Sequence, residues 1–361
     1  MRKGLCEICS PKQWKTISTD LLTGTGYPVY GANGVIGYYS EYNHTEPTLL
    51  ITCRGATCGM LNICKPYSYV NGNAMALDNL TPDVNISYLY YYLQNRGFKD
   101  VITGSAQPQI VRQSLEKVQI YYPDLQIQTA IVSLLDKVSD LIYLRKQQLA
   151  KLDELVKSRF VELFGAETEF DKWPCCTIGD AADVCVGVVI KPTQYYTDKG
   201  IPAFRSLNIG EMRVKDSDWV YFTEEGHQKN QKSVVHKNDV LVVRSGAPGT
   251  ACVATEKYDG YNAVDIIIAH PDNSKVNSIF LAAFTNMPHG RNQIRERTGG
   301  AAQQHFNVGG YKAMRLIMPS IELQNQFAAF VNQTDKSKLT VQQSLDKLEL
   351  LKKALMQKYF G

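Results

Sequence analysis

Apolar side chains recur at alternating four- and three-residue steps in two long segments, one central and one terminal. The central segment carries them at Ile131, Leu135, Val138, Ile142, Leu149, Leu152, Val156 and Leu163. The terminal segment carries them at Phe327, Val331, Val341, Leu345, Leu348, Leu355 and Tyr359. Polar residues occupy the other positions of the spacing, Arg145 and Arg159 in the central segment and Thr334, Lys338 and Lys352 in the terminal one. This heptad spacing predicts two long helices, the first over 127–164, each with the apolar seam of a coiled coil. At about 1.5 Å per residue, each helix would be about 55 Å long.

The segments that precede these helices have the pattern of short strands and turns. Residues 48–52 and 240–243 are β-rich runs. Asn33-Gly34, which follows Tyr30, predicts a hairpin turn. Ser87 and Ser278 are each expected to cap a short amphipathic helix. We therefore predict the α+β fold class, with a curved β-sheet and short helices before each long helix.

The second half of the chain repeats the first. Phe-Gly ends both helical segments, at Phe164 and Phe360, so the offset between the halves is 360 − 164 = 196 residues. The same offset aligns Pro123 with Pro319, Gln128 with Gln324 and residues 104–107 with 300–303. Further upstream the offset varies, and the aligned pairs are Arg54 with Arg244, Gly59 with Gly249, Asn73 with Asn262 and Ser87 with Ser278. Ordered matches of this kind predict a tandem internal repeat.

The repeat divides the chain into four parts. Two similar domains are predicted at 1–125 and 166–320, and two spacer helices at 126–165 and 321–361. Antiparallel packing of the helices would relate the domains by a pseudo-twofold axis. Duplex DNA has local twofold symmetry, and half-sites about 34 Å apart face the same side of it.

Composition and charge narrow the class of protein. No stretch reaches the roughly 18 apolar residues of a membrane span and the N-terminus lacks an apolar signal region, so we expect a cytoplasmic protein with no membrane association. Cys6 and Cys9 form one close pair among nine cysteines, but no second pair at a matching gap completes a zinc site. We therefore expect reduced thiols and no metal. The net charge of +4 restricts any nucleic-acid surface to a local region.

The motifs of common enzyme sites are absent. The chain has no G-x4-G-K-[ST] loop, no H-E-x-x-H pair and no N-P-P-Y tetrapeptide of amino-methyltransferases. Gly31, Gly34 and Gly37 have the spacing G-x-x-G-x-x-G, which differs from that of a dinucleotide-binding loop. We expect no catalytic residue in this chain.

Polar residues in the predicted loops are candidates for nucleic-acid contact. Arg offers a bidentate donor pair to guanine or phosphate, and Gln and Asn bind adenine in the same way. The candidates are Asn33, Tyr39, His44, Arg54, Thr57, Gln107, Gln109, Arg205, Asn208, Arg244, Ser245, Gln303, Gln304 and His305. Residues shared by both copies, such as Gln107 and Gln303, are alternatively braces of the fold, and residues that differ are better candidates for reading sequence.

On these features the chain resembles the DNA-specificity subunit of Type I restriction–modification systems. The marks are the G-[SA]-A-Q segments at 104–107 and 300–303, the two P-x4-Q motifs that end at Gln128 and Gln324, and the Phe-Gly helix ends. The resemblance covers essentially the whole chain, and the ordered pair of complete sets is its most specific feature.

The resemblance implies a DNA-binding protein with two target-recognition domains, each reading one half of a split asymmetric site in double-stranded DNA. The two helices would set the unread gap and dock two adenine methyltransferase subunits, and restriction/translocase subunits would join the complex. This chain would be non-catalytic and hold no cofactor, because S-adenosylmethionine, ATP and Mg²⁺ would belong to the partner subunits. The residues expected at the docking region are Leu149, Leu152, Val156, Leu163, Leu345, Leu348, Leu355 and Tyr359.

Three alternatives remain open on the sequence. The chain could be the recognition subunit of a methylation-only or fused restriction system. A coiled-coil protein-interaction scaffold with two protein-binding domains would lack salt-dependent DNA affinity. A methyltransferase or nuclease with degenerate motifs would act on DNA without a partner.

Overall fold

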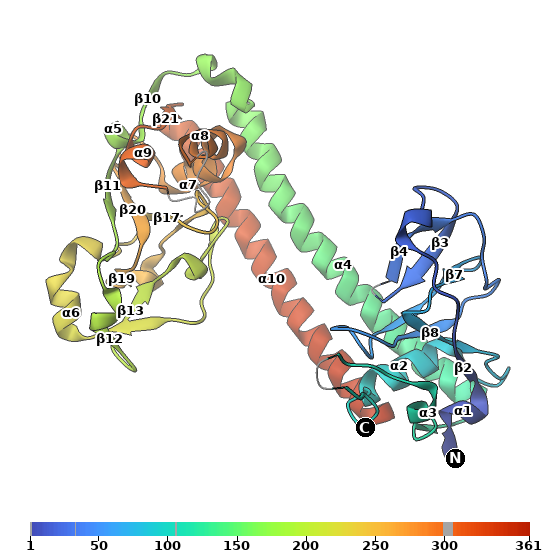
Figure 1. Ribbon diagram of the computed structural model, residues 1–361. Helices are drawn as coiled ribbons and strands as arrows, with labels where there is room; N and C mark the ends of the chain where they lie inside the picture. Colours follow the sequence, from blue (N-terminus) through green and yellow to red (C-terminus); the bar gives the residue numbers. More distant parts are fainter. Residues whose placement is uncertain (1, 33, 105–106, 299–305) are drawn as a thin grey trace. The chain divides into compact units, whose positions relative to one another are not determined.

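The computed structural model describes residues 2–32, 34–104, 107–298 and 306–361. It consists of two compact units (Figure 1). Unit 1 comprises Met1–Gln147 and Gln342–Gly361, and unit 2 comprises Gln148–Val341. Two helices of 40 residues each, α4 (Leu125–Phe164) and α10 (Ile321–Phe360), contribute a stretch to both units. The first helix begins two residues before its predicted start.

Unit 1 holds a sheet-rich domain whose strands are short. Four antiparallel strands form its main sheet in the order β2-β8-β5-β6, and a second sheet has the order β4-β3-β7. Its elements are β1 (Arg2–Gly4), α1 (Leu5–Ile8), β2 (Ser10–Gln13), η1 (Thr19–Leu21), β3 (Tyr27–Gly31), β4 (Gly34–Tyr39), β5 (Leu49–Thr52), β6 (Leu61–Ile63), β7 (Tyr69–Val70), β8 (Ala74–Asp78), α2 (Ile86–Arg96), α3 (Arg112–Leu115) and β9 (Gln119–Tyr121).

Unit 2 holds a domain built on the same plan. Its sheets have the orders β11-β20-β17-β18 and β12-β16-β13-β19. The first elements are η2 (Glu167–Lys172), β10 (Cys175–Thr177), α5 (Ile178–Ala181), β11 (Ala182–Val186), η3 (Pro192–Tyr195), β12 (Tyr196–Thr197), β13 (Ile201–Phe204), η4 (Ser206–Asn208), β14 (Ile209–Gly210), β15 (Arg213–Val214) and β16 (Val220–Phe222). The rest are α6 (Glu224–Lys229), η5 (Gln231–Ser233), β17 (Val240–Val243), β18 (Ala251–Val253), η6 (Glu256–Tyr258), β19 (Asn262–Ala263), β20 (Ile266–Pro271), α7 (Ser278–Asn286), α8 (Pro288–Thr298), α9 (Val308–Lys312) and β21 (Arg315–Ile317).

Strand pairing confirms the predicted internal repeat. β3 pairs in parallel with β7 in unit 1, and β13 pairs in parallel with β19 in unit 2. β9 pairs with β1, and β21, which lies 196 residues after β9, pairs with β10. The pairing corrects one sequence match: Asn262 lies in β19, the counterpart of β7, so Asn73 is not its equivalent. A sequence match of only one or two residues can be misaligned in this way, because several alignments of so short a run match equally well.

The hairpin predicted at Asn33-Gly34 is confirmed by the strands on both sides of it. β3 and β4 are antiparallel neighbours, with Gly31 opposite Gly34. Gly34 has a φ of +86°, a conformation that glycine adopts without a steric penalty. Asn33 itself lies outside the described residues.

Within each unit the two helices run antiparallel, as predicted. In unit 1 the Nε of Arg145 donates to the hydroxyl of Ser344 at 3.2 Å, while Leu135 shares an apolar cluster with Met356. Residue numbers therefore rise along α4 as they fall along α10. In unit 2 Phe160 packs against Phe327 with ring centroids 5.4 Å apart.

A buried glutamine fastens each long helix to its domain by the same three hydrogen bonds. The side chain of Gln128 accepts from the N–H of Asn85 at 2.9 Å and donates to the carbonyls of Asp83 and Pro123. Gln324 accepts from the N–H of Asn277 at 2.9 Å and donates to the carbonyls of Lys275 and Pro319. Both glutamines are 0% exposed, so the P-x4-Q motif has a structural role.

The caps of α2 and α7 differ from the predicted ones. The side chain of Asn85 accepts hydrogen bonds from the backbone N–H groups of Ser87 and Tyr88 and so caps α2. Asn277 caps α7 in the same way. Ser87 and Ser278 therefore lie inside the first turn, and the prediction that they are caps was wrong. Asn and Ser are both good caps, so the sequence alone did not decide between neighbours.

Several global features bear on what the chain can bind. All nine cysteines are free thiols. Across the described ranges, no three His, Cys, Asp or Glu side chains are grouped so that they could hold a metal ion. Among the described residues, none of the helices combines the length and the apolar character needed to cross a membrane.

Candidate nucleic-acid interface

The loop after β5 brings four of the predicted residues of unit 1 together. Arg54 is exposed and pairs with Gln109 in an isolated antiparallel bridge. The N–H of Gly55, which has a φ of +87°, donates to the carbonyl of Pro108 at 3.1 Å. Exposed Gln107 and half-buried Thr57 belong to the same two segments.

This pair of loops has the properties of an anion-binding surface. No carboxylate of the described residues pairs with the guanidinium group of Arg54. Gly55 has open space where a Cβ would be, so a ligand can approach its backbone closely. An exposed cation, two exposed amides and an accessible backbone suit contact with phosphate or base edges.

The corresponding loop of unit 2 is shifted by one residue from the sequence match. The carbonyl of Cys53 accepts from the N–H of Ile110, and the carbonyl of Arg244 accepts from the N–H of Phe306. Arg244 therefore occupies the buried position of Cys53, and Ser245, half-buried, is the counterpart of Arg54.

Arg244 is consequently committed to the interior. Its side chain is 9% exposed and forms an ion pair with Asp265 at 2.7 Å. Its Nε donates to the carbonyl of Phe306 at 3.1 Å. Arg244 is therefore not a candidate for DNA contact, because contact with a base would break its partly buried ion pair with Asp265.

Two other predicted residues of unit 2 lie in the turn after β13. Asn208 is 0% exposed; its side chain accepts from the N–H of Arg205 at 2.9 Å and donates to the carbonyl of Ser217 at 2.7 Å. These bonds hold the turn. Arg205 is half-buried, and its guanidinium group donates to the carbonyl of Asp218. Arg205 stays a candidate, whereas Asn208 serves the fold.

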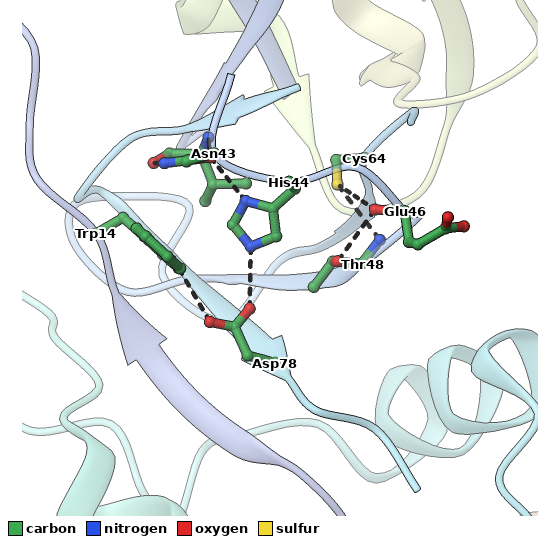
Figure 2. A network of polar contacts seen from close by, with 8 residues as sticks. Trp14, Asn43, His44, Glu46, Thr48, Cys64 and Asp78 are labelled. Carbon is green, nitrogen blue, oxygen red and sulfur yellow. Dashed lines mark hydrogen bonds and ion pairs between the residues drawn. The ribbon is translucent and has the colours of Figure 1, made fainter. Parts of the chain in front are cut away.

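His44 lies in a buried polar network of unit 1. Figure 2 shows its ring between Asn43 and Asp78. Its Nε2 lies 2.9 Å from the carboxylate of Asp78 and its Nδ1 lies 2.7 Å from the side-chain oxygen of Asn43. The indole N–H of Trp14 donates to the other carboxylate oxygen at 3.0 Å. With 8% of its surface exposed and both nitrogens bonded, His44 is a brace between loop and sheet.

The remaining predicted contacts are less informative. Tyr39 ends β4 and packs its ring edge against Tyr69, with centroids 5.7 Å apart. Its side chain is half-buried in a small apolar cluster. Gln303, Gln304 and His305 lie outside the described residues.

Unit 2 contains a polar network that the sequence did not suggest. The Nδ1 of His270 lies 2.7 Å from the carboxylate of Asp239, and its Nε2 lies 3.6 Å from the Sγ of Cys185. The hydrogen bond to Asp239, followed by that to Cys185, raises the pKa of His270 from 6.5 to about 10. His270 lies opposite Asp183 in the sheet, as Asp78 lies opposite Ser10, so each domain has a His–Asp pair with one member at this strand position, His270 in unit 2 and Asp78 in unit 1. No sequence signal marks this pair, because its members are 31 residues apart.

The residues predicted for partner docking lie mostly inward. Val156 and Leu163 pack in the main core of unit 2, and Leu355 and Tyr359 pack against the tyrosines of α2 in unit 1. Leu345 is 5% exposed. The other three, Leu149, Leu152 and Leu348, are half-buried. These residues of the heptad seam therefore pack inside their own unit.

Other apolar side chains of the helices face solvent. Ile127, Leu134 and Leu141 of α4 follow one another at seven-residue steps and are 50%, 37% and 44% exposed. Leu350 of α10 is 69% exposed. Apolar rows of this kind mark interaction surfaces more often than isolated exposed residues do.

Comparison with known proteins shows what this chain is similar to. Residues 2–154 match the model of the Type I restriction modification DNA specificity domain. The chain is 30% identical over 115 residues to the specificity subunit of Type I restriction enzyme EcoprrI from Escherichia coli, which covers 32% of this chain and 28% of that protein. It is 22% identical to the putative type I restriction enzyme specificity subunit S.HindORF215P from Haemophilus influenzae, over 95% of this chain and 91% of that protein.

Two solved structures share the fold over the whole chain. The S subunit of the Type I restriction-modification system from M. genitalium superposes with a TM-score of 0.65 at 15% identity, covering 100% of this chain and 96% of that chain. A chain from a structure on complex assembly and conformational transition of the type I R-M system has a TM-score of 0.59 at 14% identity, with 100% and 97% covered. At these identities the similarity establishes the fold.

Proposed function

We propose a function that proceeds from one premise, that the chain belongs to the family of Type I restriction–modification specificity subunits. Each of its two domains reads one half of a bipartite site in double-stranded DNA. The helices α4 and α10 set the number of unread base pairs between the halves. The observation that carries the proposal is the same domain topology, twice in one chain, with the same buried glutamine fastening each domain to a long helix.

The loops of unit 1 support DNA contact at its half-site. Exposed Arg54 has no acidic partner among the described residues, and it adjoins exposed Gln107 and Gln109. A cation of this kind binds phosphate or guanine, and the amides bind adenine. The two units carry different side chains at corresponding loop positions, Arg54 and Ser245, so their half-sites are expected to differ.

Catalysis belongs to partner subunits in this proposal. Two adenine methyltransferase subunits dock on the long helices, and the outward row of Ile127, Leu134 and Leu141 is a better docking surface than the buried seam. S-adenosylmethionine would be bound by those subunits, and ATP and Mg²⁺ by restriction/translocase subunits. The domain boundaries at 1–125, 126–165, 166–320 and 321–361 stay predictions of the same proposal.

Domain exchange combined with methylation mapping tests the proposal. The chain is expressed with its neighbouring methyltransferase, and methylated adenines are mapped across the genome. Residues 1–124, which precede α4, are then replaced by those of a related chain with a different site. We expect one half-site to change and the other half and the gap to stay.

Two results would contradict the proposal. One is that methylation follows no bipartite sequence, or that both halves change together. The other is that the purified chain alone transfers methyl groups to DNA. A protein-interaction scaffold predicts instead that the chain has no salt-dependent affinity for duplex DNA.

A further inference from the structure

Unit 2 presents two apolar side chains at the tip of a short loop after β11. Val189 is 47% exposed and Ile190 is 80% exposed, the largest value among the large apolar side chains that the structure describes. Burying such a side chain would stabilise the fold, so leaving it in water forgoes that contribution. A single exposed apolar residue is ordinary on a protein surface. What distinguishes this tip is that the chain on both sides of it is held in a fixed conformation.

The chain before the tip is fixed to the sheet. A Cβ on Gly187 would lie 2.5 Å from the carbonyl oxygen of Ala263, so only glycine allows this close crossing. The N–H of Val188 donates to the carbonyl of Ala263 at 2.8 Å, and the N–H of Asp265 donates to the carbonyl of Val188 at 3.2 Å.

The ion pair of Arg244 reinforces this attachment. Asp265 has a φ of +48°, which is sterically unfavourable for a residue with a side chain. Its carboxylate is held 2.7 Å from the guanidinium group of Arg244, which also bonds to the carbonyl of Phe306. The buried arginine therefore fixes the base of the loop.

The chain after the tip is equally restricted. Lys191 has a φ of +45°, a left-handed conformation that is sterically unfavourable for a non-glycine residue. Pro192 then fixes its own φ and starts the turn η3, where the N–H of Gln194 donates to the carbonyl of Lys191. Lys191 is exposed, and no acidic residue of the described part of the chain pairs with it.

We infer that Ile190 and Lys191 form a DNA-contacting tip of unit 2, with Ile190 against base edges in a groove and Lys191 on a backbone phosphate. The inference rests on the proposed function. Apolar side chains contact the thymine methyl group, and a lysine beside them neutralises a phosphate. β-branched side chains such as Val189 and Ile190 have few rotamers to lose on binding.

A protein partner fits this tip less well than DNA. A stable protein interface covers about 800 Å² on each side, which two side chains do not supply. A groove of DNA admits a narrow tip, and phosphates flank it on both sides. The unpaired ammonium group of Lys191 matches that negative charge.

The test uses the full chain in complex with its methyltransferase partner and a duplex that carries the mapped site. Ile190→Ser is expected to weaken specific binding about tenfold and to relax the sequence read in one half-site only. Ile190→Val keeps a β-branched apolar side chain and is the matched control, with binding within about twofold of the wild type.

Lys191 has a different expected signature. Lys191→Ala should lower the slope of log affinity against log salt by about one, equally on specific and random DNA, and leave the sequence preference unchanged. Lys257→Ala is the control, because the ammonium group of Lys257 already pairs with Asp216. Thermal unfolding of all variants should match the wild type.

The binding of Ile190→Ser tests the inference, and the methylation pattern of the wild type tests the proposed function. If the wild type methylates a bipartite site and Ile190→Ser binds it within about twofold with unchanged sequence, the inference is overturned and the proposed function stands. Relaxation of both half-sites by Ile190→Ser would also overturn it. If the wild type methylates no bipartite site, the proposed function itself fails.

Discussion

Buried polar residues account for much of what the two domains share. Gln128 and Gln324 make the same three backbone hydrogen bonds, and Asn85 and Asn277 cap equivalent helices. Arg244 is a further case of a polar residue that works inside the fold. These two repeated pairs, the glutamines and the asparagines, are thus braces of the fold.

The buried glutamines lead to a stability prediction. Gln128→Ala leaves the N–H of Asn85 and the carbonyls of Asp83 and Pro123 without their partner, and each unpaired buried group costs about 1–3 kcal/mol. We expect unit 1 to lose at least about 3 kcal/mol of unfolding free energy in denaturant titration, because three groups lose their partner. Gln126→Ala, on the exposed face of the same turn, should change it by less than about 0.5 kcal/mol. Equal losses in both variants would contradict the bracing role.

The His270–Asp239 pair predicts a pH dependence. The pKa of His270 is raised from 6.5 to about 10 when the protein is folded, so its pair stabilises unit 2 fully below pH 6.5 and progressively less as the pH rises toward 10. His270→Gln should therefore destabilise unit 2 by about 1–3 kcal/mol at pH 6, and by much less near pH 10.

Thermal unfolding across this pH range measures the effect. His236→Gln is the matched control, since the side chain of His236 is 61% exposed and its Nδ1 lies 3.6 Å from Asp259. A destabilisation by His270→Gln that is the same at pH 6 and pH 10 would contradict the ion pair.

Sequence predicted residue roles only where a backbone pattern determines them. The hairpin at Asn33-Gly34 followed from turn chemistry. The role of Arg244 did not, because its sequence match with Arg54 is one residue out of register: Arg244 occupies the buried position of Cys53 and not the exposed position of Arg54. His44 was equally hidden, because its partner Asp78 lies 34 residues away in sequence.

At the scale of elements, the two helix stretches differ between the units. In unit 1 the ammonium group of Lys352 lies 5.6 Å from the ring centroid of Tyr91, whose hydroxyl donates to Asp136 at 2.6 Å. The position equivalent to Lys352 in unit 2, 352 − 196 = 156, is Val156, which is 7% exposed. Unit 1 therefore has a polar layer where unit 2 has an apolar one. The heptad pattern predicted the long helices to within two residues, because the apolar period fixes them.

Because unit 1 has a polar layer where unit 2 has an apolar one, substitutions at Lys352 and Val156 should change the stability of their units unequally. Burial lowers the pKa of Lys352, which means that the charged ammonium group is destabilised where it lies. Lys352→Met should keep unit 1 as stable as the wild type or stabilise it by up to about 1 kcal/mol. Val156→Lys should destabilise unit 2 by about 3 kcal/mol, since it buries a charge among aromatic side chains. Denaturant titration compares the two, and a Lys352→Met variant that loses more than about 1 kcal/mol would contradict this account.

At the scale of the whole molecule, each unit combines a domain with stretches of both long helices. Unit 1 is discontinuous in sequence, because Met1–Gln147 folds with Gln342–Gly361. Phe360 packs against Tyr88 at 5.4 Å between centroids, and Phe164 packs against Phe280 at 4.8 Å. The sequence repeat predicted this duplication. The shared helices give a direct physical link between the two proposed half-sites.

The length of the helices is therefore the most direct test of the central claim. One helical turn of four residues, about 6 Å, is inserted into both α4 and α10 at the limit between the units, after Gln147 and after Val341.

Methylated adenines are then mapped in cells that express the lengthened chain with its methyltransferase. The account predicts that both half-sites keep their sequences and that the unread gap between them grows by about one or two base pairs. A bipartite site with an unchanged gap, or a change in the bases read, would contradict it.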